Sequence, residues 1–455
     1  MSQSLAEMLG PDVLFFDEPT RREFAGDKWS QGALPDMVAR PRTTAEVATI
    51  LAWANERAVS VTPRGAGWGY VGGAITNRGG VLLSLDRLNA IREISGDDFV
   101  AVVEAGVLTG DLQEAVKARG LFYPPDPASL KYSSIGGNIA ANAGGPRCLK
   151  YGVTRHYVLG LEVVLPDGRI LQLGGRTHKN KTGFDLLGLF VGSEGMLGVV
   201  TGATLRLLPH PPARAALSAI FPTLEGAASG VKAIFAAGIL PAATEIADAF
   251  TLRCFRESQG LPLDENAGAH VLVECDGQLS SVREELELVA HALKTAGASE
   301  ISRATSEADV EALWQTRRAF SLSLNAPNRA KLNEDIVVPR GKLLELVAFC
   351  EALGARHGVQ IACFGHAGDG NIHVNLLLPT DPDAPENSQE KAQSALDELF
   401  AQVLSWGGAI TGEHGIGLAK ARWWPEAVSC EVREMHREMK RLFDPIGILN
   451  PGKWV

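Results

Sequence analysis

The sequence predicts an α+β protein of two domains, the first built on a mixed sheet and the second on an antiparallel sheet. Its 455 residues exceed the usual size of a single hydrophobic core. Short apolar segments typical of strands alternate with occasional helices, without the regular βαβ rhythm of a doubly wound parallel sheet. The run LLPHPPAR (207–214) carries three prolines, which can continue neither a helix nor a central strand.

Helical and strand periodicities locate the elements. Residues 43–58 form a predicted helix with Val47, Ile50, Leu51 and Ala54 on one face. We expect a second helix over 110–119, ended by Gly120, and strands over 59–63, 81–85, 99–106, 161–165 and 169–173.

The second half favours longer helices. Residues 280–297 repeat apolar side chains at helical spacing, next to a strand over 270–275. We expect an exposed acidic loop over 379–389 and a last helix that ends at Asp444-Pro445. The predicted division is an N-terminal segment 1–34, a first domain 35–212, a second domain 213–405 and a C-terminal segment 406–455 that returns to the first domain.

Composition excludes several classes of function. The net charge is -10, and no Lys/Arg cluster suits a nucleic acid. None of the cysteines forms a C-x-x-C pair, which argues against a thiolate metal site, an iron–sulfur cluster and a disulfide scaffold. With no signal peptide and no membrane span in view, we expect a cytoplasmic protein, with contact to the inner membrane only peripheral.

Three glycine-rich segments lie within about 140 residues. PRGAGWGYVGGA (63–74) contains G-x-G-x-x-G, with Asp86 in the place of a ribose acid, but the turn sequence ITNRGG follows instead of a helix, so we reject a Rossmann motif. Alone, this run could be an ordinary hairpin. Together with residues 124–145 and 180–201 it predicts backbone amides that line a long polar ligand.

A fourth segment, FGHAGDGNIHVN (364–375), places two imidazoles around a glycine turn. Strand, turn and strand would bring His366 and His373 face to face. Glu413 and His414 in TGEHGIG offer a carboxylate and a further imidazole, pointing to opposite sides of an extended chain. Two imidazoles and a carboxylate suit a catalytic zinc site. Histidines elsewhere are expected to be surface or satisfied polar residues: His156, His178, His210, His270, His291, His357 and His436.

Four segments, PRGAGWGYVGGA, SIGGNIAANAGG, KTGFDLLGLFVGSEGMLGVVT and the closing ILNPGKWV, closely resemble the FAD-binding domain of the vanillyl-alcohol oxidase and p-cresol methylhydroxylase flavoproteins. GHAGDGNIH and GEHGIG resemble the branch of FAD-linked D-2-hydroxyacid dehydrogenases that act on D-lactate, glycolate or D-2-hydroxyglutarate. The resemblance spans residues 35 to 455 and implies a fold of the p-cresol methylhydroxylase type with an α+β substrate domain as its cap.

The resemblance also implies roles for individual residues. The cofactor would contact Pro63, Arg64, Gly65, Ala66, Gly67, Trp68, Gly69, Tyr70, Gly72, Gly73, Pro125, Asp126, Ser129, Ser134, Gly136, Gly137, Asn138, Asn142, Gly144, Gly145, Gly195, Val199 and Asn450. His366, His373 and Glu413 would bind a divalent metal, usually zinc, and His414 would be the general base. Arg317, in the pattern W-x-x-R, would hold the substrate carboxylate, and Asn375 would face the substrate.

Departures from the family pattern refine these expectations. Trp68 replaces a small residue, and the first loop lacks the histidine that bonds FAD covalently, so we expect non-covalent FAD. Relatives that take dicarboxylates carry a lysine where this chain has Asn333, with Lys331 two residues earlier. This favours a small monocarboxylate such as D-lactate, while D-2-hydroxybutyrate and D-mandelate stay open.

The predicted function is oxidation of a D-2-hydroxy acid to the 2-oxo acid by hydride transfer to flavin N5. The electron acceptor would be a quinone, a cytochrome or an electron-transfer flavoprotein, and a homodimer stays open. Two alternatives remain: a FAD-binding electron-transfer subunit without its own substrate, and a non-redox, alkyl-ether-forming flavoprotein.

Overall fold

The computed structural model describes residues 5–10, 12–259, 266–325, 329–379 and 385–455. Its chain divides into two compact units. The first unit comprises Met1–Gly145, Gly152–His210 and Glu413–Val455, and the second comprises Pro146–Tyr151 and Pro211–Gly412. The main boundaries are therefore 210/211 and 412/413, where the sequence suggested 212/213 and 405/406.

The described residues of the first unit form two larger sheets and a two-stranded one, with helices around them. Its elements are α1 Leu5–Met8, β1 Leu14–Phe15, α2 Glu18–Phe24, β2 Met37–Ala39, α3 Thr44–Glu56, β3 Val61–Arg64, β4 Val81–Ser84, β5 Ile91–Ser95, β6 Val100–Glu104, α4 Thr109–Lys117, β7 Leu121–Phe122, α5 Ile135–Ala141, η1 Thr154–Tyr157, β8 Val158–Val164, β9 Ile170–Gly174, α7 Leu186–Phe190, β10 Val199–Arg206, β11 Leu208–Pro209, α14 Trp424–Ala427 and α15 Cys430–Phe443.

The first sheet has the order β1-β2-β4-β3 and is mixed, since β1 runs antiparallel to β2 while β2 and β3 run parallel to β4. Helix α3 packs the side chains predicted from its periodicity, Val47, Ile50, Leu51 and Ala54, into the core of this sheet. The C-terminal segment joins the same core: Leu449 forms a parallel bridge with Val61. This bridge joins β3 to the C-terminal segment, which follows it by more than 380 positions in the sequence.

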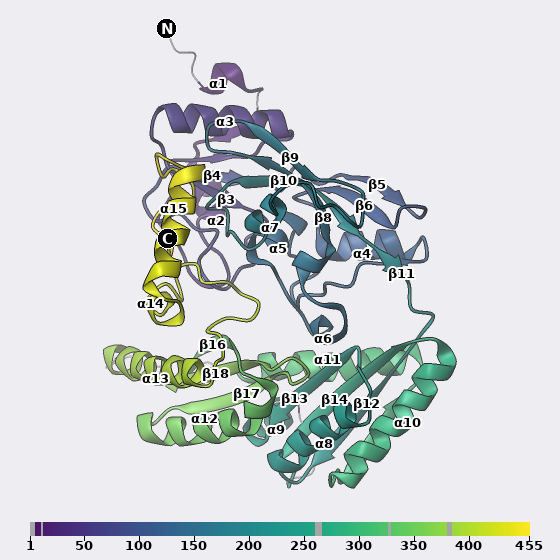
Figure 1. Ribbon diagram of the computed structural model, residues 1–455. Coiled ribbons are helices and arrows are strands. Elements are labelled where there is room, and N and C mark those ends of the chain that lie inside the picture. Colours follow the sequence, from purple (N-terminus) through teal and green to yellow (C-terminus); the bar gives the residue numbers. More distant parts are fainter. Residues whose placement is uncertain (1–4, 11, 260–265, 326–328, 380–384) are drawn as a thin grey trace. The chain divides into compact units, whose positions relative to one another are not determined.

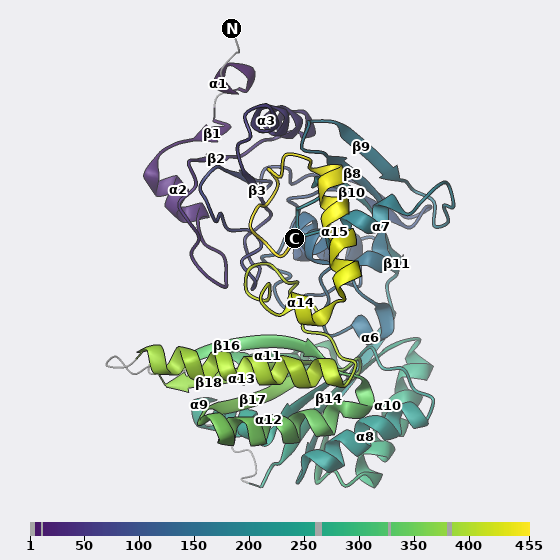
Figure 2. The ribbon, with the colours of Figure 1, turned by 60° about the vertical axis from the view of Figure 1, so that its left-hand side comes forward.

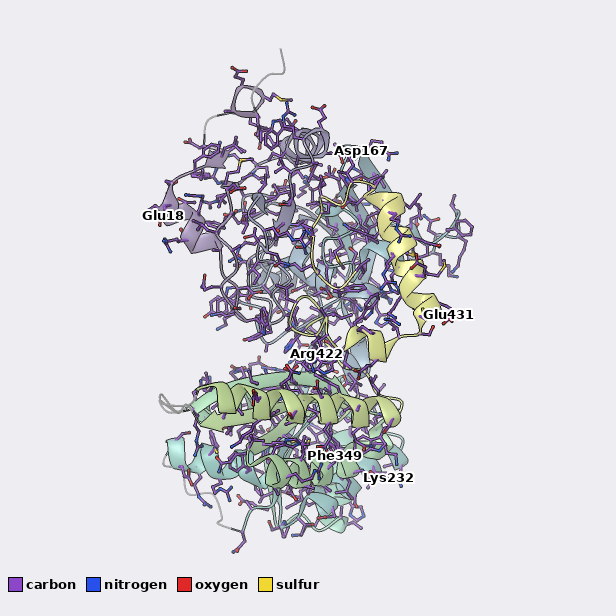
Figure 3. All side chains as sticks on the ribbon, turned by 90° about the vertical axis from the view of Figure 1, so that its left-hand side faces the viewer. Glu18, Asp167, Lys232, Phe349, Arg422 and Glu431 are labelled. Carbon is purple, nitrogen blue, oxygen red and sulfur yellow. The ribbon has the colours of Figure 1, made fainter. Side chains whose placement is uncertain are left out.

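The second sheet of the first unit, β5-β6-β10-β8-β9, is antiparallel throughout. Helices α5 and α7 lie between the long strands and α15, the C-terminal helix, whose first turn carries Glu431 (Figures 1 and 3). The edge of Phe443 of α15 packs against Phe190 of α7 at 5.4 Å between ring centroids. The glycine-rich segments lie in the connections of these sheets.

The second unit is built on one antiparallel sheet of order β15-β12-β14-β13-β17-β18-β16. Its elements are α6 Cys148–Tyr151, β12 Ala213–Phe221, α8 Leu224–Ala236, β13 Ala243–Asp248, α9 Ala249–Gln259, β14 Ala269–Gly277, α10 Leu279–Thr295, β15 Glu300–Ala304, α11 Glu307–Ser323, β16 Arg329–Val337, η2 Arg340–Lys342, α12 Leu343–His357, β17 Gln360–His366, β18 Asn371–Pro379 and α13 Pro385–Ser405.

Two layers of helices cover this sheet. Helices α8, α10, α12 and α13 pack on one face, where Figure 2 shows α12 alongside α13 and Figure 3 marks Lys232 of α8 and Phe349 of α12. Helices α9 and α11 pack on the other face, against a cluster that includes Ala247, Phe320 and Phe364. Pro146–Tyr151 attaches here through ion pairs of Arg147 with Glu274 and of Lys150 with Asp276.

The mixed sheet, the antiparallel second sheet and the helices α3 and α10 confirm the predicted α+β class. The prediction of an acidic loop over 379–389 was wrong in part. Residues 380–384 lie outside the described residues, but helix α13 already begins at Pro385. Proline suits the first turn of a helix, where its missing N–H has no partner to lose. Among the described residues, no helix is long and apolar enough to cross a membrane.

Candidate functional site

The glycine-rich segments of the first unit line a cavity of about 300 Å³. The first loop, the 127–144 segment and the 193–200 segment all contribute to its wall. Of the residues expected to contact a cofactor, the lining includes Pro63, Arg64, Gly65, Ala66, Gly67, Trp68, Gly69, Tyr70, Gly73, Ser129, Ser134, Gly136, Gly137, Asn138, Gly144, Gly195 and Val199. The three segments therefore share one site.

Six expected cofactor contacts are outside this lining: Gly72, Pro125, Asp126, Asn142, Gly145 and Asn450. Several of them support the wall instead. Asn142 ends helix α5 in a left-handed conformation and accepts a hydrogen bond from the Arg155 amide. Asn450 donates through Nδ2 to the carbonyls of Gly73 and Glu194, and so ties the C-terminal segment to two cavity-lining segments.

Arg64 is the clearest sign that the cavity accepts an anion. It lines the cavity, it is only 9% exposed, and its Nη1 has no hydrogen-bond partner among the described residues. The guanidinium packs on Gly67, whose φ is +73°, so that an added Cβ there would lie 2.0 Å from Nη2. A buried donor without a partner is costly unless a ligand supplies the acceptor. The residues present thus fit the diphosphate of a dinucleotide.

Two aromatic side chains stack at this cavity. The rings of Trp68 and Tyr132 lie 4.1 Å apart between centroids at an angle of 9°, and Lys28 Nζ lies 3.8 Å from the Trp68 centroid. Trp68, noted above as a departure from the family pattern, is therefore fixed by two partners. Tyr132 and Lys28 carried no signal of this role in the sequence.

Glu413 and His414 also line the cavity. The His414 ring stacks on Tyr70, with centroids 5.0 Å apart. Glu194 holds the next two residues: its carboxylate accepts hydrogen bonds of 2.8 Å from the amides of Ile416 and Gly417. Burial raises the pKa of Glu194, partly offset by those amides. Glu194 itself lines the cavity, so these two hydrogen bonds hold the loop that carries His414 in the cavity wall.

In the second unit, His366 and His373 lie together as predicted from the glycine turn. Strands β17 and β18 pair so that His366 is opposite Asn371 and His373 is opposite Phe364, which puts both imidazoles on one face of the sheet. Their ring centroids are 5.4 Å apart at an angle of 82°. The helices α9 and α11 cover this face.

A buried carboxylate, Glu245 of β13, binds one of these imidazoles. Glu245 Oε1 is 2.6 Å from His366 Nδ1, and Oε2 is 2.7 Å from both Nε and Nη2 of Arg317. Burial alone would raise the pKa of Glu245, but His366 and Arg317 lower it to about 2. The Nε and Nη2 side of the Arg317 guanidinium is thus engaged by Glu245, which leaves Nη1 for a ligand.

Further along the same face, Asn375 of β18 is directly opposite Asn333 of β16. The Oδ1 atoms of both carboxamides are buried and have no hydrogen-bond partner among the described residues. The side chain of Lys331, two residues before Asn333, is held by Ser321: its Nζ donates hydrogen bonds to the carbonyl and the hydroxyl of that residue. Burial lowers the pKa of Lys331.

Glu413 follows directly on Gly412, whose amide donates to Asp335 in the second unit at 2.8 Å. His366 and His373 each offer an imidazole nitrogen, and Glu413, the residue after Gly412, offers a carboxylate oxygen. Two imidazole nitrogens and a carboxylate oxygen form a donor set that suits zinc, which commonly takes three protein ligands in catalytic sites. The residues present therefore fit a divalent cation.

Among the other histidines, one is more unusual than expected. His270 is buried on β14, where its Nε2 lies 2.8 Å from the Ser218 hydroxyl. Burial, together with the nearby charge of Arg317, lowers the pKa of His270 to about 4. Sequence reasoning also missed Glu194, Glu245 and Lys453, whose Nζ binds the carbonyls of Gly72 and Ile75. Each acts on residues far away in sequence, which leaves no local pattern.

Comparison with known proteins identifies the two halves of the chain. Residues 35–174 match the model of the FAD binding domain, and residues 210–454 match the C-terminal domain of FAD linked oxidases. The chain is thus a flavoprotein with a cavity that fits its cofactor.

Individual relatives define the family more closely. The chain is 38% identical to glycolate oxidase subunit GlcD of Bacillus subtilis and 34% identical to D-lactate dehydrogenase of Anaerostipes hadrus; the alignments cover 100% of this chain and 96% of each relative. A crystal structure of p-cresol methylhydroxylase shares the fold, with a TM-score of 0.81 at 18% identity over 99% of this chain and 95% of that chain.

The chain belongs to the FAD-linked oxidases, in the branch of D-2-hydroxyacid dehydrogenases that these relatives represent. The resemblance noted in the sequence and the predicted class of enzyme are both confirmed.

Proposed function

We propose that the chain oxidises a small D-2-hydroxy monocarboxylate, D-lactate first among them, to the 2-oxo acid, using non-covalent FAD and a divalent cation, zinc. The observation that carries this proposal is the pairing of His366 and His373 on one face of the second unit's sheet, with ring centroids 5.4 Å apart. Glu413, which follows Gly412 in the chain, would complete the ligand set. His414 follows Glu413 in the chain and lines the cavity that fits FAD. The names of the relatives, which include a D-2-hydroxyglutarate dehydrogenase, agree on 2-hydroxy acids.

When bound, FAD would supply the acceptor for the hydride of the substrate α-carbon, and the cation would supply a Lewis acid for its hydroxyl oxygen. A ring nitrogen of His414 would accept the hydroxyl proton, because an imidazole with an ordinary pKa near ~6.5 is largely neutral at pH 7. Arg317 Nη1 would bind the carboxylate, and Asn375 would donate to or accept from the substrate.

The polar face of the second unit supports a short substrate. At the position where relatives acting on dicarboxylates place a lysine, Asn333 is opposite Asn375, and neither side chain bears a charge. The nearest cation along the strand, Lys331, is bound to Ser321. A second carboxylate at this position would therefore meet two uncharged carboxamides instead of a lysine, which supports a monocarboxylate.

We assign the electrons to a quinone, a cytochrome or an electron-transfer flavoprotein. The glycine-rich loop that resembles a nicotinamide motif belongs to the FAD cavity, and Asp86 is bound by Arg40 and Ser84 instead of facing a ribose. The two rival functions, an electron-transfer subunit and an alkyl-ether-forming flavoprotein, would need no cation at His366 and His373. A solved alkyldihydroxyacetonephosphate synthase shares this fold at 19% identity, which is a likeness of fold alone.

Metal analysis of the purified FAD-loaded protein tests the proposal. We expect one zinc or another divalent cation per chain, loss of D-lactate-dependent dye reduction after chelation, and recovery when the cation is restored. His373→Ala should abolish stoichiometric binding while FAD stays bound. Activity that survives complete removal of the cation would reject the proposed role of these ligands.

A further inference from the structure

Glu245 is a buried carboxylate on β13 that no part of the proposed chemistry uses. Its side chain is 0% exposed, and it belongs to the same sheet face as His366, to which it is directly opposite in the β13–β17 pair. An ionised carboxylate in such a place is costly unless its oxygens are bound by cationic or donor groups.

The two oxygens of Glu245 are divided between two partners. Oε1 binds the imidazole of His366 through Nδ1 at 2.6 Å, and Oε2 binds Arg317 through Nε and Nη2 at 2.7 Å. His366 belongs to β17 and Arg317 to α11. The Glu245 carboxylate therefore connects a proposed ligand of the cation on the sheet to the guanidinium of a helix that covers the sheet. The guanidinium also lies on the Phe364 ring, with 4.9 Å to its centroid, which limits its other orientations.

The contact with Oε1 determines which nitrogen of His366 can bind a cation. A carboxylate accepts hydrogen bonds and cannot donate them when ionised, so Nδ1 must carry the proton. In the neutral imidazole, Nε2 then keeps its lone pair, the form in which imidazole binds metals. In the opposite tautomer, Nδ1 and Oε1 would face each other as two acceptors.

We propose that Glu245 is a positioning residue that serves both sites: it holds His366 in the Nδ1–H form with Nε2 toward the cation, and it holds Arg317 with Nη1 toward the substrate carboxylate. The inference rests on the proposed function, which supplies the cation and the carboxylate. Its new content is that one buried side chain couples the affinity for the cation to the affinity for the substrate.

Zinc binding to Glu245→Gln tests the hold of Glu245 on His366, with Glu274→Gln as the matched control. Glu274 is a carboxylate on the next strand, 1% exposed, that binds Arg147, Arg214 and the Trp314 indole but not His366. Calorimetry on the FAD-loaded, cation-free proteins should show zinc affinity about 10-fold or more weaker in Glu245→Gln. Glu274→Gln should bind zinc like wild type, and Glu245→Asp should recover part of the loss.

Two outcomes separate the inference from the function on which it rests. If wild type binds no divalent cation, the proposed function fails. If wild type and Glu245→Gln bind zinc equally, the function stands and the role of Glu245 is wrong. A measurement on wild type guards against a variant that does not fold: ring 15N spectra, assigned with His366→Gln, should show His366 protonated on Nδ1, and a proton on Nε2 would overturn the inference.

Discussion

Two adjacent side chains, Glu413 and His414, have separate duties in the proposed chemistry. Glu413 would offer an oxygen to the cation held by His366 and His373, while His414 stacks on Tyr70 in the wall of the cavity. The two residues are neighbours in the chain, and a different carboxylate holds the backbone on each side of them. Asp335 accepts a hydrogen bond from the Gly412 amide, and Glu194 accepts hydrogen bonds from the Ile416 and Gly417 amides.

Replacing His414 with Asn should leave FAD bound and slow flavin reduction by D-lactate about 100- to 10,000-fold, the usual contribution of a general base. Asparagine keeps a polar side chain of similar reach but cannot accept the proton. Stopped-flow absorbance under anaerobic conditions measures the rate. His178→Asn, at an exposed position outside the cavity, is the control. Reduction of the His414→Asn flavin at the wild-type rate would remove His414 from this role.

The histidines themselves could be predicted from local sequence, since glycines and strand alternation decide where His366 and His373 point. Their supporting carboxylates could not. Glu245 lies 121 positions before His366, and Glu194 lies more than 220 positions before the amides that it binds. Only the pairing of strands β13 and β17 and the packing of the C-terminal segment bring them together.

At the scale of elements, strand alternation concentrates polar groups on one face of the second sheet. Glu245, His366, His373, Asn375 and Asn333 share this face through consecutive register pairs. The 3.6- and 2-residue periodicities predicted helices α3 and α10 and several strands correctly, because each buries one regular face. The start of α13 was missed because its first residues are polar and carry no such face.

His270, on the same face, gives the second unit a pH dependence. In the folded chain, burial lowers the pKa of His270 to about 4 from its ordinary value of 6.5. The unfolded chain therefore binds more protons between these values, and the free energy of unfolding falls as pH is lowered from 6.5 to 4. The loss from this group is about 3 kcal/mol, at about 1.4 kcal/mol per pKa unit.

Urea unfolding of wild type and His270→Gln across this range measures the effect. The difference between the two proteins should change by about 3 kcal/mol, since each unit of pKa shift is worth about 1.4 kcal/mol. The comparison is necessary because burial raises the pKa of Asp248 to about 6, which acts with the opposite sign in both proteins. Parallel curves for the two proteins would show that His270 is protonated as readily in the folded state as in the unfolded state.

The first glycine loop offers a test of the cofactor cavity. A Cβ added at Gly73 would meet no heavy atom within 4 Å, and its backbone is compatible with alanine. Gly73→Ala should therefore keep the stability of the FAD-free protein but weaken FAD binding about 10-fold, the cost of about 1.4 kcal/mol of overpacking against the cofactor.

Fluorescence titration of the FAD-free proteins measures this change. Gly341→Ala, where a Cβ is equally unhindered in η2 of the second unit, should bind FAD like wild type. FAD affinity equal in Gly73→Ala and wild type would place the cofactor away from this part of the loop.

At the scale of the whole molecule, the chain contributes to each unit more than once. Pro146–Tyr151 leaves the first unit to join the second, and Glu413–Val455 returns to the first, where Lys453 and Asn450 bind the first glycine loop. The return of the C-terminal segment was expected from the family resemblance. The sequence did not predict that Pro146–Tyr151 belongs to the second unit, because its ion pairs with Glu274 and Asp276 join residues more than 120 positions apart.

The central claim is that one chain holds both the flavin and the cation that oxidise a D-2-hydroxy acid. Anaerobic mixing of the purified protein with matched D- and L-2-hydroxy acids, before and after chelation, tests it most directly. We predict that D-lactate bleaches the flavin absorbance, that L-lactate and D-2-hydroxyglutarate do so far more slowly, and that chelation stops the bleaching until zinc is restored. Flavin that stays oxidised with every acid, or that bleaches equally without the cation, would contradict the claim.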